Sequence, residues 1–145
     1  QGAAPDAADP DGRTALMMAA YNGHTETVKL LLDRGAKVDA LDLMGRTALM
    51  YSASGPFAPT VQLLITRGAD PNIRDADEGF TALMFAAAEG QVEVIKALLS
   101  HGADVTIKDN DGDRALDFAV KNGHKIAAGL LKKEAELKPD SKNTP

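Results

Sequence analysis

Cysteine and tryptophan are both absent from this chain of 145 residues, and aromatic residues make up only 4% of it. Without cysteine there can be no disulfide framework, no thiolate metal site and no cysteine nucleophile. With so few rings, the core must form from thin elements that approach each other closely. Alanine, the commonest residue of the chain, suits such elements. A length of this size predicts one domain.

An excess of positive charge and a long apolar run are also missing. The formal net charge is -5, from 16 basic and 21 acidic residues. Nucleic-acid binders and polybasic membrane anchors present clustered lysine and arginine, so we expect neither nucleic acid nor a membrane as a partner. The apolar run at 15–21 is far too short to cross a bilayer. The hydrophobic content of 44% is ordinary for a folded chain.

The strongest pattern in the sequence is a repeat. The segment DPDGRTALM at 9–17 returns as DLMGRTALM at 42–50, and shorter versions begin at Asp75 and Asp109. A second motif, with Leu-Leu or Leu-Ile followed three residues later by Gly-Ala, occupies 31–36, 64–69 and 98–103. Two separate motifs that keep one period predict an array of stacked structural units.

These motifs resemble the ankyrin repeat, which runs Asp-x-x-Gly-x-Thr-Pro-Leu-His, then Ala-Ala, Gly-His, and later Leu-Leu-x-x-Gly-Ala. The resemblance covers residues 9 to 133 or so and implies an all-α solenoid of about four helix-turn-helix repeats with projecting turns. One departure is consistent, because Thr-Pro-Leu-His is replaced by Thr-Ala-Leu-Met in three repeats and by Arg-Ala-Leu-Asp at 114–117. This variant is similar to bacterial members of the family. Without the imidazole, contacts between repeats should rely more on leucine and methionine.

The repeat pattern divides the chain into segments. We expect repeat 1 at 9–41, repeat 2 at 42–74, repeat 3 with a one-residue insertion at 75–108, and a C-terminal capping repeat at 109–137. Residues 1–8 are interpreted either as the tail of a truncated preceding repeat or as a leader. The polar residues 138–145 are expected to form a flexible tail.

Local signals support helices within each repeat. A threonine precedes each of the first three apolar helical patterns, where its hydroxyl can accept a hydrogen bond from the first turn; these are Thr14, Thr47 and Thr81. In the last repeat we expect Asp113 to take this capping role. Leu64 and Leu98 are predicted to be buried between consecutive repeats. Phe57, in an irregular turn, is expected to plug that turn.

No pattern in the sequence indicates catalysis or metal binding. The acidic segment 109–113 has its glycine in the fourth position and Val120 in the twelfth, which does not fit a calcium loop. His24 and His124 occupy the same repeat position, so we interpret them as structural, and His101 lies far from both. Neither a nucleophile elbow nor a phosphate loop is present. We therefore expect no catalytic residue, no metal and no cofactor.

In the ankyrin family the tips of the turns and the exposed side of the first helix form a concave face that meets partner proteins. Aromatic and methionine residues on such a face favour binding, and arginines can supply polar contacts. The predicted partner-binding residues are Tyr21, Leu41, Leu43, Met44, Arg46, Arg74, Asp77 and Phe80. We expect the apolar members of this set to be exposed. The alternative is that they pack against neighbouring turns and that the arginines only contact solvent.

The resemblance implies a non-catalytic protein–protein interaction module that binds a partner protein through its concave face. Two alternatives stay open: an inhibitor or protector of a bacterial enzyme that occludes its active site, and a non-catalytic repeat domain of a larger enzyme. We expect a monomer, because a chain with this net charge and few exposed apolar residues has little tendency to self-associate. The compartment, bacterial cytoplasm or periplasm, is not determined by the sequence.

Overall fold

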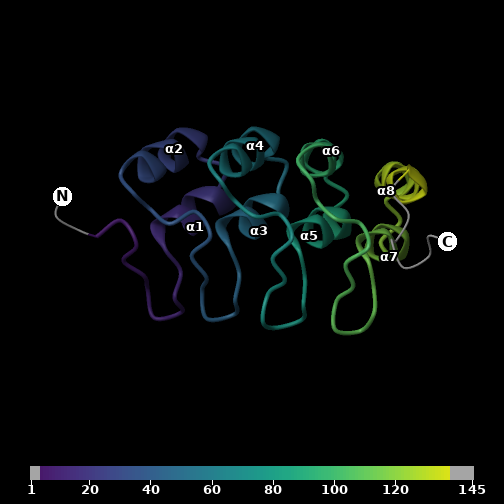
Figure 1. Ribbon diagram of the computed structural model, residues 1–145, viewed down its shortest axis with the longest axis horizontal. Coiled ribbons are helices and arrows are strands. Elements are labelled where there is room, and N and C mark those ends of the chain that lie inside the picture. Colours follow the sequence, from purple (N-terminus) through teal and green to yellow (C-terminus); the bar gives the residue numbers. More distant parts are fainter. Residues whose placement is uncertain (1–3, 138–145) are drawn as a thin grey trace.

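The fold is a stack of helix pairs with turns that project from one side (Figure 1). A computed structural model describes residues 4–137; residues 1–3 and the predicted flexible tail at 138–145 lie outside the described part. The eight helices found there are α1 (Ala15–Tyr21), α2 (Thr25–Asp33), α3 (Ala48–Ala53), α4 (Ala58–Thr66), α5 (Ala82–Glu89), α6 (Val92–Ser100), α7 (Ala115–Lys121) and α8 (Lys125–Leu137). Between residues 4 and 137, β-structure is limited to one isolated bridge between Ala8 and Thr14. The predicted all-α class is confirmed.

The helices form two layers. In Figure 1 the first helices of the pairs, α1, α3, α5 and α7, lie between the second helices and the projecting turns. Each first helix packs against the first helix of the next repeat, and the second helices do the same. Among the described residues, no helix combines the length and apolar character needed to cross a membrane.

Threonine caps begin the first three pairs, as predicted. In each case the hydroxyl accepts the backbone N–H three residues on, with N···O distances of 3.3, 3.2 and 3.3 Å for Thr14, Thr47 and Thr81. The last repeat differs, and the prediction that Asp113 caps α7 is wrong. There the carboxylate of Asp117 accepts the Arg114 backbone N–H at 2.8 Å, and Asp113 instead binds Lys121 Nζ at 2.7 Å. The Asp117 carboxylate thus satisfies the amide of the first residue of the turn, while the Asp117 amide, which a threonine hydroxyl would bind, donates to the Arg114 carbonyl at 3.0 Å.

The core consists of alanine, leucine, valine, isoleucine and methionine side chains. Leu64 and Leu98 have no exposed surface, as predicted, and the methionines that follow the capping threonines are buried beside them. None of the six aromatic residues belongs to the fully buried core of residues 4–137. Four of the rings, those of Tyr51, Phe80, Phe85 and Phe118, are partly buried and pack against the edge of the core.

One position before each second helix links neighbouring repeats. His124 Nε2 lies 3.0 Å from the Ala88 carbonyl oxygen, and its ring lies against Gly90, where an added Cβ would come within 2.4 Å of it. At the equivalent position of repeat 2, the Phe57 ring lies against Gly23 of repeat 1 in the same way. Phe57 also packs on Gly55 of its own turn, so it fills the turn as expected.

The projecting turns are joined into a ladder. An aspartate opens each repeat and accepts backbone N–H groups from the rest of its own turn, which fixes the turn's shape; the four are Asp9, Asp42, Asp75 and Asp109. Backbone bonds then join adjacent turns: the Leu43 amide donates to the Asp11 carbonyl at 3.0 Å, and the Ala76 amide donates to the Met44 carbonyl at 2.8 Å. Side chains on these turns are thereby held at fixed positions opposite the first helices.

Candidate functional site

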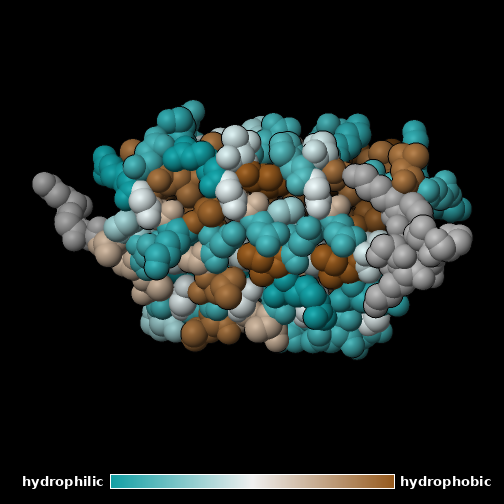
Figure 2. Space-filling view, in the orientation of Figure 1, coloured by the Kyte–Doolittle hydropathy of each residue, from teal (hydrophilic) through white to brown (hydrophobic). Residues whose placement is uncertain are grey.

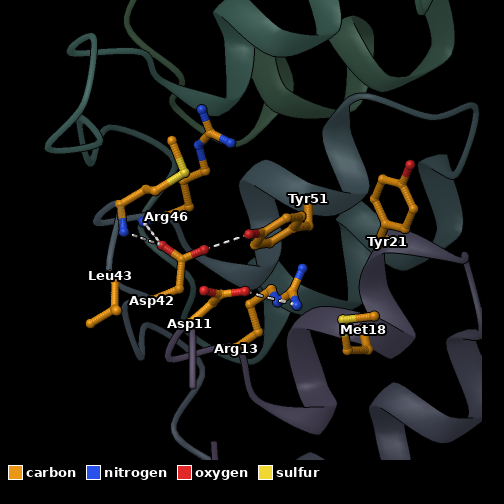
Figure 3. Close-up of a pocket in the computed structure, with 9 residues that line it drawn as sticks. Asp11, Arg13, Met18, Tyr21, Asp42, Leu43, Arg46 and Tyr51 are labelled. Carbon is orange, nitrogen blue, oxygen red and sulfur yellow. Dashed lines mark hydrogen bonds and ion pairs between the residues drawn. The ribbon is translucent and has the colours of Figure 1, made fainter. Parts of the chain in front are cut away.

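A groove of about 550 Å³ lies between repeats 1 and 2, where the projecting turns face α1 and α3 (Figure 3). Its lining residues come from two turns and two helices: Asp11, Arg13, Met18, Tyr21, Asp42, Leu43, Met44, Arg46 and Tyr51. The groove is open to solvent. In Figure 2 hydrophobic groups gather at the tip of the second turn, whereas the turns toward the C-terminal end are mainly hydrophilic.

The walls of the groove are exposed apolar side chains. Leu43 is 75% exposed, Tyr21 55%, and Met18 and Met44 about two fifths each. The rings of Tyr21 and Tyr51 meet edge to face, with centroids 6.2 Å apart and an interplanar angle of 87°. Large apolar side chains that stay exposed in a stable fold are typical of surfaces that bind another molecule.

The floor of the groove is a hydrogen bond between Tyr51 and Asp42. The Tyr51 hydroxyl donates to Oδ2 of Asp42, and Oδ1 of the same carboxylate accepts the backbone amides of Met44 and Arg46, each at 2.9 Å. Burial and the adjacent Asp42 carboxylate raise the pKa of Tyr51 to about 12. The phenol is therefore neutral over the physiological pH range and stays a hydrogen-bond donor to Asp42.

Arg13 is held on the first turn by two aspartates. Its Nε lies 2.9 Å from Asp9 Oδ2, and its Nη2 lies 3.1 Å from Asp11 Oδ2. The Arg13 backbone amide and guanidinium together lower the pKa of the Asp9 carboxyl. In this position the guanidinium does not reach Asp42, whose second oxygen is occupied by Tyr51.

Repeats 2 and 3 meet in a different way. Arg46 occupies in repeat 2 the position of Arg13 in repeat 1, but its Nε extends to Asp75 of the next repeat at 3.2 Å. Its guanidinium lies 5.3 Å from the centroid of the Phe85 ring, which is the repeat-3 equivalent of Tyr51. The Arg46 side chain is only 23% exposed, and that of Asp75 has no exposed surface. The hollow that remains between Arg46, Tyr51 and Phe85 has a volume of about 140 Å³.

Repeats 3 and 4 are closed by aromatic packing. Phe80, which replaces the arginine at this position, packs edge to face on both Phe85 and Phe118, with centroid distances of 5.5 and 5.4 Å. Lys121 Nζ lies 5.7 Å from the centroid of the Phe118 ring. The hollow in this region is only about 40 Å³.

The structure brings four of the predicted binding residues to the groove: Tyr21, Leu43, Met44 and Arg46. Leu41 is 55% exposed but lies outside the lining. Arg74 contacts the Gly79 carbonyl and the Asn110 side chain on the third and fourth turns.

Two expectations about exposure need correction. Phe80 is not an exposed ring but a half-buried one, because Phe85 and Phe118 surround it. Arg46 is not a merely solvated charge, because it pairs with buried Asp75 across the junction and lies 3.8 Å from the Asp77 carboxylate.

Sequence reasoning missed Met18 and Tyr51. Both belong to one column of equivalent positions on the first helices, Met18, Tyr51, Phe85 and Phe118, which follows the repeat period. A large side chain that recurs at this position was the available signal. The sequence did not show that this side chain faces the surface, because the position lies in the middle of a helix whose other residues contribute to the core.

No group of three or more histidine, aspartate or glutamate side chains in residues 4–137 is arranged to hold a metal ion. The charged groups of the groove already have partners: Arg13 pairs with Asp11, Arg46 pairs with Asp75 and Asp77, and Asp42 accepts the Tyr51 hydroxyl. The groove is therefore suited to contact another molecule through tyrosine rings, methionine side chains and ion pairs.

Comparison with known families supports the repeat pattern. A family model described as ankyrin repeats (3 copies) matches residues 1–75 and 55–143, which together cover nearly the whole chain. A search of the curated proteins gave no match.

Proposed function

The chain belongs to the ankyrin-repeat family, and from this we infer a non-catalytic module that binds a partner protein through the face formed by its first helices and projecting turns. Ankyrin repeats are in general protein–protein interaction modules and are typically non-catalytic. Docking is centred on the groove between repeats 1 and 2, through Tyr21, Leu43, Met44 and Arg46. Leu41, Arg74, Asp77 and Phe80 flank it on the same face.

One observation carries this proposal. The groove is the place where exposed apolar side chains, two tyrosine rings and a volume of about 550 Å³ coincide. At the other two junctions, Arg46 and Phe80 fill the equivalent space. Binding energy at protein interfaces is concentrated in a few large anchors, often aromatic ones.

Affinity capture from the source cells tests the proposal. Bait carrying Tyr21→Ala or Met44→Ala should lose at least about tenfold of its affinity for the captured partner, as expected when a hot-spot side chain is truncated. Tyr21 is 55% and Met44 40% exposed, so the thermal unfolding curve of each variant should stay near that of the wild type. Phe80→Ala is less suitable because it removes packing on two rings, whereas Tyr21→Ala removes one ring contact, with Tyr51.

Lys29→Ala and Lys96→Ala are the matched controls. Both lysines lie on second helices and are more than half exposed, paired with Asp33 and Glu93 on their own helices. A partner whose affinity falls with these lysines, and not with Tyr21 and Met44, would overturn the assignment of the binding face.

A further inference from the structure

The groove has a chemical preference that becomes visible when the three junctions are compared. Phe85 and Phe118 each carry a cation of the chain over the ring, Arg46 and Lys121 respectively. Tyr51 is the third ring of the same column. Within residues 4–137, no cation of the chain lies over it.

The Tyr51 hydroxyl explains this difference. At the junction of repeats 2 and 3, Arg46 reaches Asp75 Oδ2, and this contact draws its guanidinium over the Phe85 ring. The equivalent acceptor for Arg13 is Asp42 Oδ2, which already accepts the Tyr51 hydroxyl. Arg13 therefore remains with Asp9 and Asp11, and the ring of Tyr51 stays accessible from the groove.

The charges around the groove favour a positive occupant. Two arginines and two aspartates, Asp11 and Asp42, line the groove, and three more aspartates outside the lining pair with those arginines: Asp9, Asp75 and Asp77. Each guanidinium already has two carboxylate partners, so an incoming carboxylate would meet net negative charge. Burial and then the Asp42 carboxylate raise the pKa of Tyr51, and the charges of Arg46 and Arg13 act on it in the opposite direction.

The whole molecule shows the same polarity. The four turn segments at 4–14, 34–47, 67–81 and 101–114 contain thirteen acidic and eight basic residues, whereas the rest of the chain contains eight of each. The four turn segments thus have a net charge of -5, equal to that of the whole chain, and the groove lies at two of them. Such a field attracts a basic partner surface and accelerates its association.

We propose that the groove between repeats 1 and 2 binds a lysine or arginine side chain of the partner protein, with the cationic head over the Tyr51 and Tyr21 rings. The aliphatic stem of that side chain and the apolar residues beside it lie on Met18, Leu43 and Met44. A cation over an aromatic face is attracted by the ring quadrupole, and long basic side chains bury their stems on apolar surface. This inference rests on the proposed function, since it specifies what the partner contributes.

Methionine methyl NMR on the intact chain tests the inference. The probes are three blocked tripeptides, acetyl-Leu-Lys-Leu-amide and the matched peptides with norleucine or glutamate in the centre. The chain has five methionines, so each methyl signal can be assigned. Met18 and Met44 report on the groove, and the buried Met17 and Met84 serve as internal references.

The lysine peptide should shift the Met18 and Met44 signals with an affinity about threefold to fivefold above that of the norleucine peptide, the size of one exposed cation–ring contact. The glutamate peptide should bind more weakly than the norleucine peptide. Raising the ionic strength from about 0.05 M to about 0.5 M should reduce the advantage of lysine, because exposed charges are screened. Equal binding of lysine and norleucine, preferred binding of glutamate, or no shift at Met18 and Met44 with any peptide would each overturn the inference.

A variant pair identifies the ring as the receptor. Tyr51→Phe frees Asp42 Oδ2 for Arg13, whose guanidinium should then cover the phenyl ring and abolish the preference for lysine. Adding Arg13→Gln should restore that preference, because the ring is again without a cation of the chain. A preference that survives Tyr51→Phe, or stays lost in the double variant, contradicts the assignment to the ring face.

The inference and the proposed function fail in different ways. If norleucine and lysine peptides bind equally well and partner capture still depends on Tyr21 and Met44, the groove is a docking site without the cation preference. If capture is insensitive to Tyr21 and Met44, the proposed docking site itself is wrong.

Discussion

The junction between repeats 1 and 2 and the junction between repeats 2 and 3 begin from nearly the same sequence. Both place an arginine before the capping threonine, an opening aspartate in the next repeat, and an aromatic residue on the next first helix. The first junction is an open groove, and the second is closed by Arg46 over Phe85. The two rings differ by one hydroxyl. At the first junction the Tyr51 hydroxyl binds Asp42 Oδ2, and at the second, where Phe85 has no hydroxyl, Arg46 binds Asp75 Oδ2.

This difference accompanies a change in one hydrogen bond, that of Tyr51 with Asp42. The backbone ladder of the turns is the same at both junctions, with Leu43 donating to Asp11 and Ala76 to Met44. The third turn is one residue longer than the first two, but its backbone bond to the second turn is equivalent. We infer that the groove depends on which side chain occupies the Oδ2 atom of the opening aspartate.

The two junctions should share one core, and the largest effect tests this. Leu64 in α4 and Leu98 in α6 are both fully buried. Changing either to alanine should lower the free energy of unfolding by about 2–5 kcal/mol, through lost transfer energy and the cavity left behind. Chemical denaturation of both variants measures it. A wild-type midpoint for Leu98→Ala would contradict the position of the core.

A smaller effect separates the two arginines. Arg46→Ala leaves the buried Asp75 carboxylate without its partner from repeat 2, so the free energy of unfolding should fall by about 1–3 kcal/mol. Arg13→Ala is the matched control, and its melting temperature should stay near that of the wild type, because its aspartate partners are solvated. Equal destabilisation by both variants would remove the distinction between the junctions.

A pH titration examines the Tyr51–Asp42 bond alone. The chain has two tyrosines, so the variant Tyr21→Phe leaves Tyr51 as the only phenol. Absorbance of the phenolate should give a midpoint of about 12, against an ordinary value of 10.0. Asp42→Asn should lower this midpoint only partly, because burial is the larger cause of the shift.

The same titration has a consequence for stability. The folded-state pKa of Tyr51 lies above that of the unfolded chain, so the unfolded state releases its proton first as the pH rises. Its contribution to stability should be complete below pH 10 and be lost as the pH rises through about 12. Tyr51→Phe should remove this component of the alkaline loss. A midpoint near 10 in the Tyr21→Phe variant would contradict a Tyr51–Asp42 bond in solution.

Most of the fold could be predicted from the sequence because its signals are local and periodic. Thr14, Thr47 and Thr81 cap helices through amides three residues away, and Leu64 and Leu98 are buried by the same stacking that repeats along the chain. Asp113 was predicted wrongly because its carboxylate binds Lys121, and the acid that accepts an amide at the start of the helix is Asp117, which binds the Arg114 N–H. Local sequence patterns predict that a helix begins here, but not which nearby acid contacts the amide at its start.

The groove could be predicted only in part. Tyr21, Leu43 and Met44 were identified as exposed apolar residues because they fall on variable positions of the repeat. The role of Arg46 depends on its ion pair with Asp75, about thirty positions along the chain in the next repeat. The role of Tyr51 depends on its hydrogen bond to Asp42, which occupies the carboxylate oxygen that an arginine could otherwise bind. Aligned by repeat, Arg13 and Arg46 look equivalent, and only the three-dimensional structure separates them.

The position of the Arg13 guanidinium in a crystal structure of the Tyr51→Phe variant tests the central claim most directly. We predict that Arg13 leaves Asp9, binds Asp42 Oδ2 and lies over the phenyl ring, so that the groove of repeats 1 and 2 becomes like the closed junction of repeats 2 and 3. If Arg13 remains on Asp9 and Asp11 and the groove stays open, the Tyr51 hydroxyl does not control this surface.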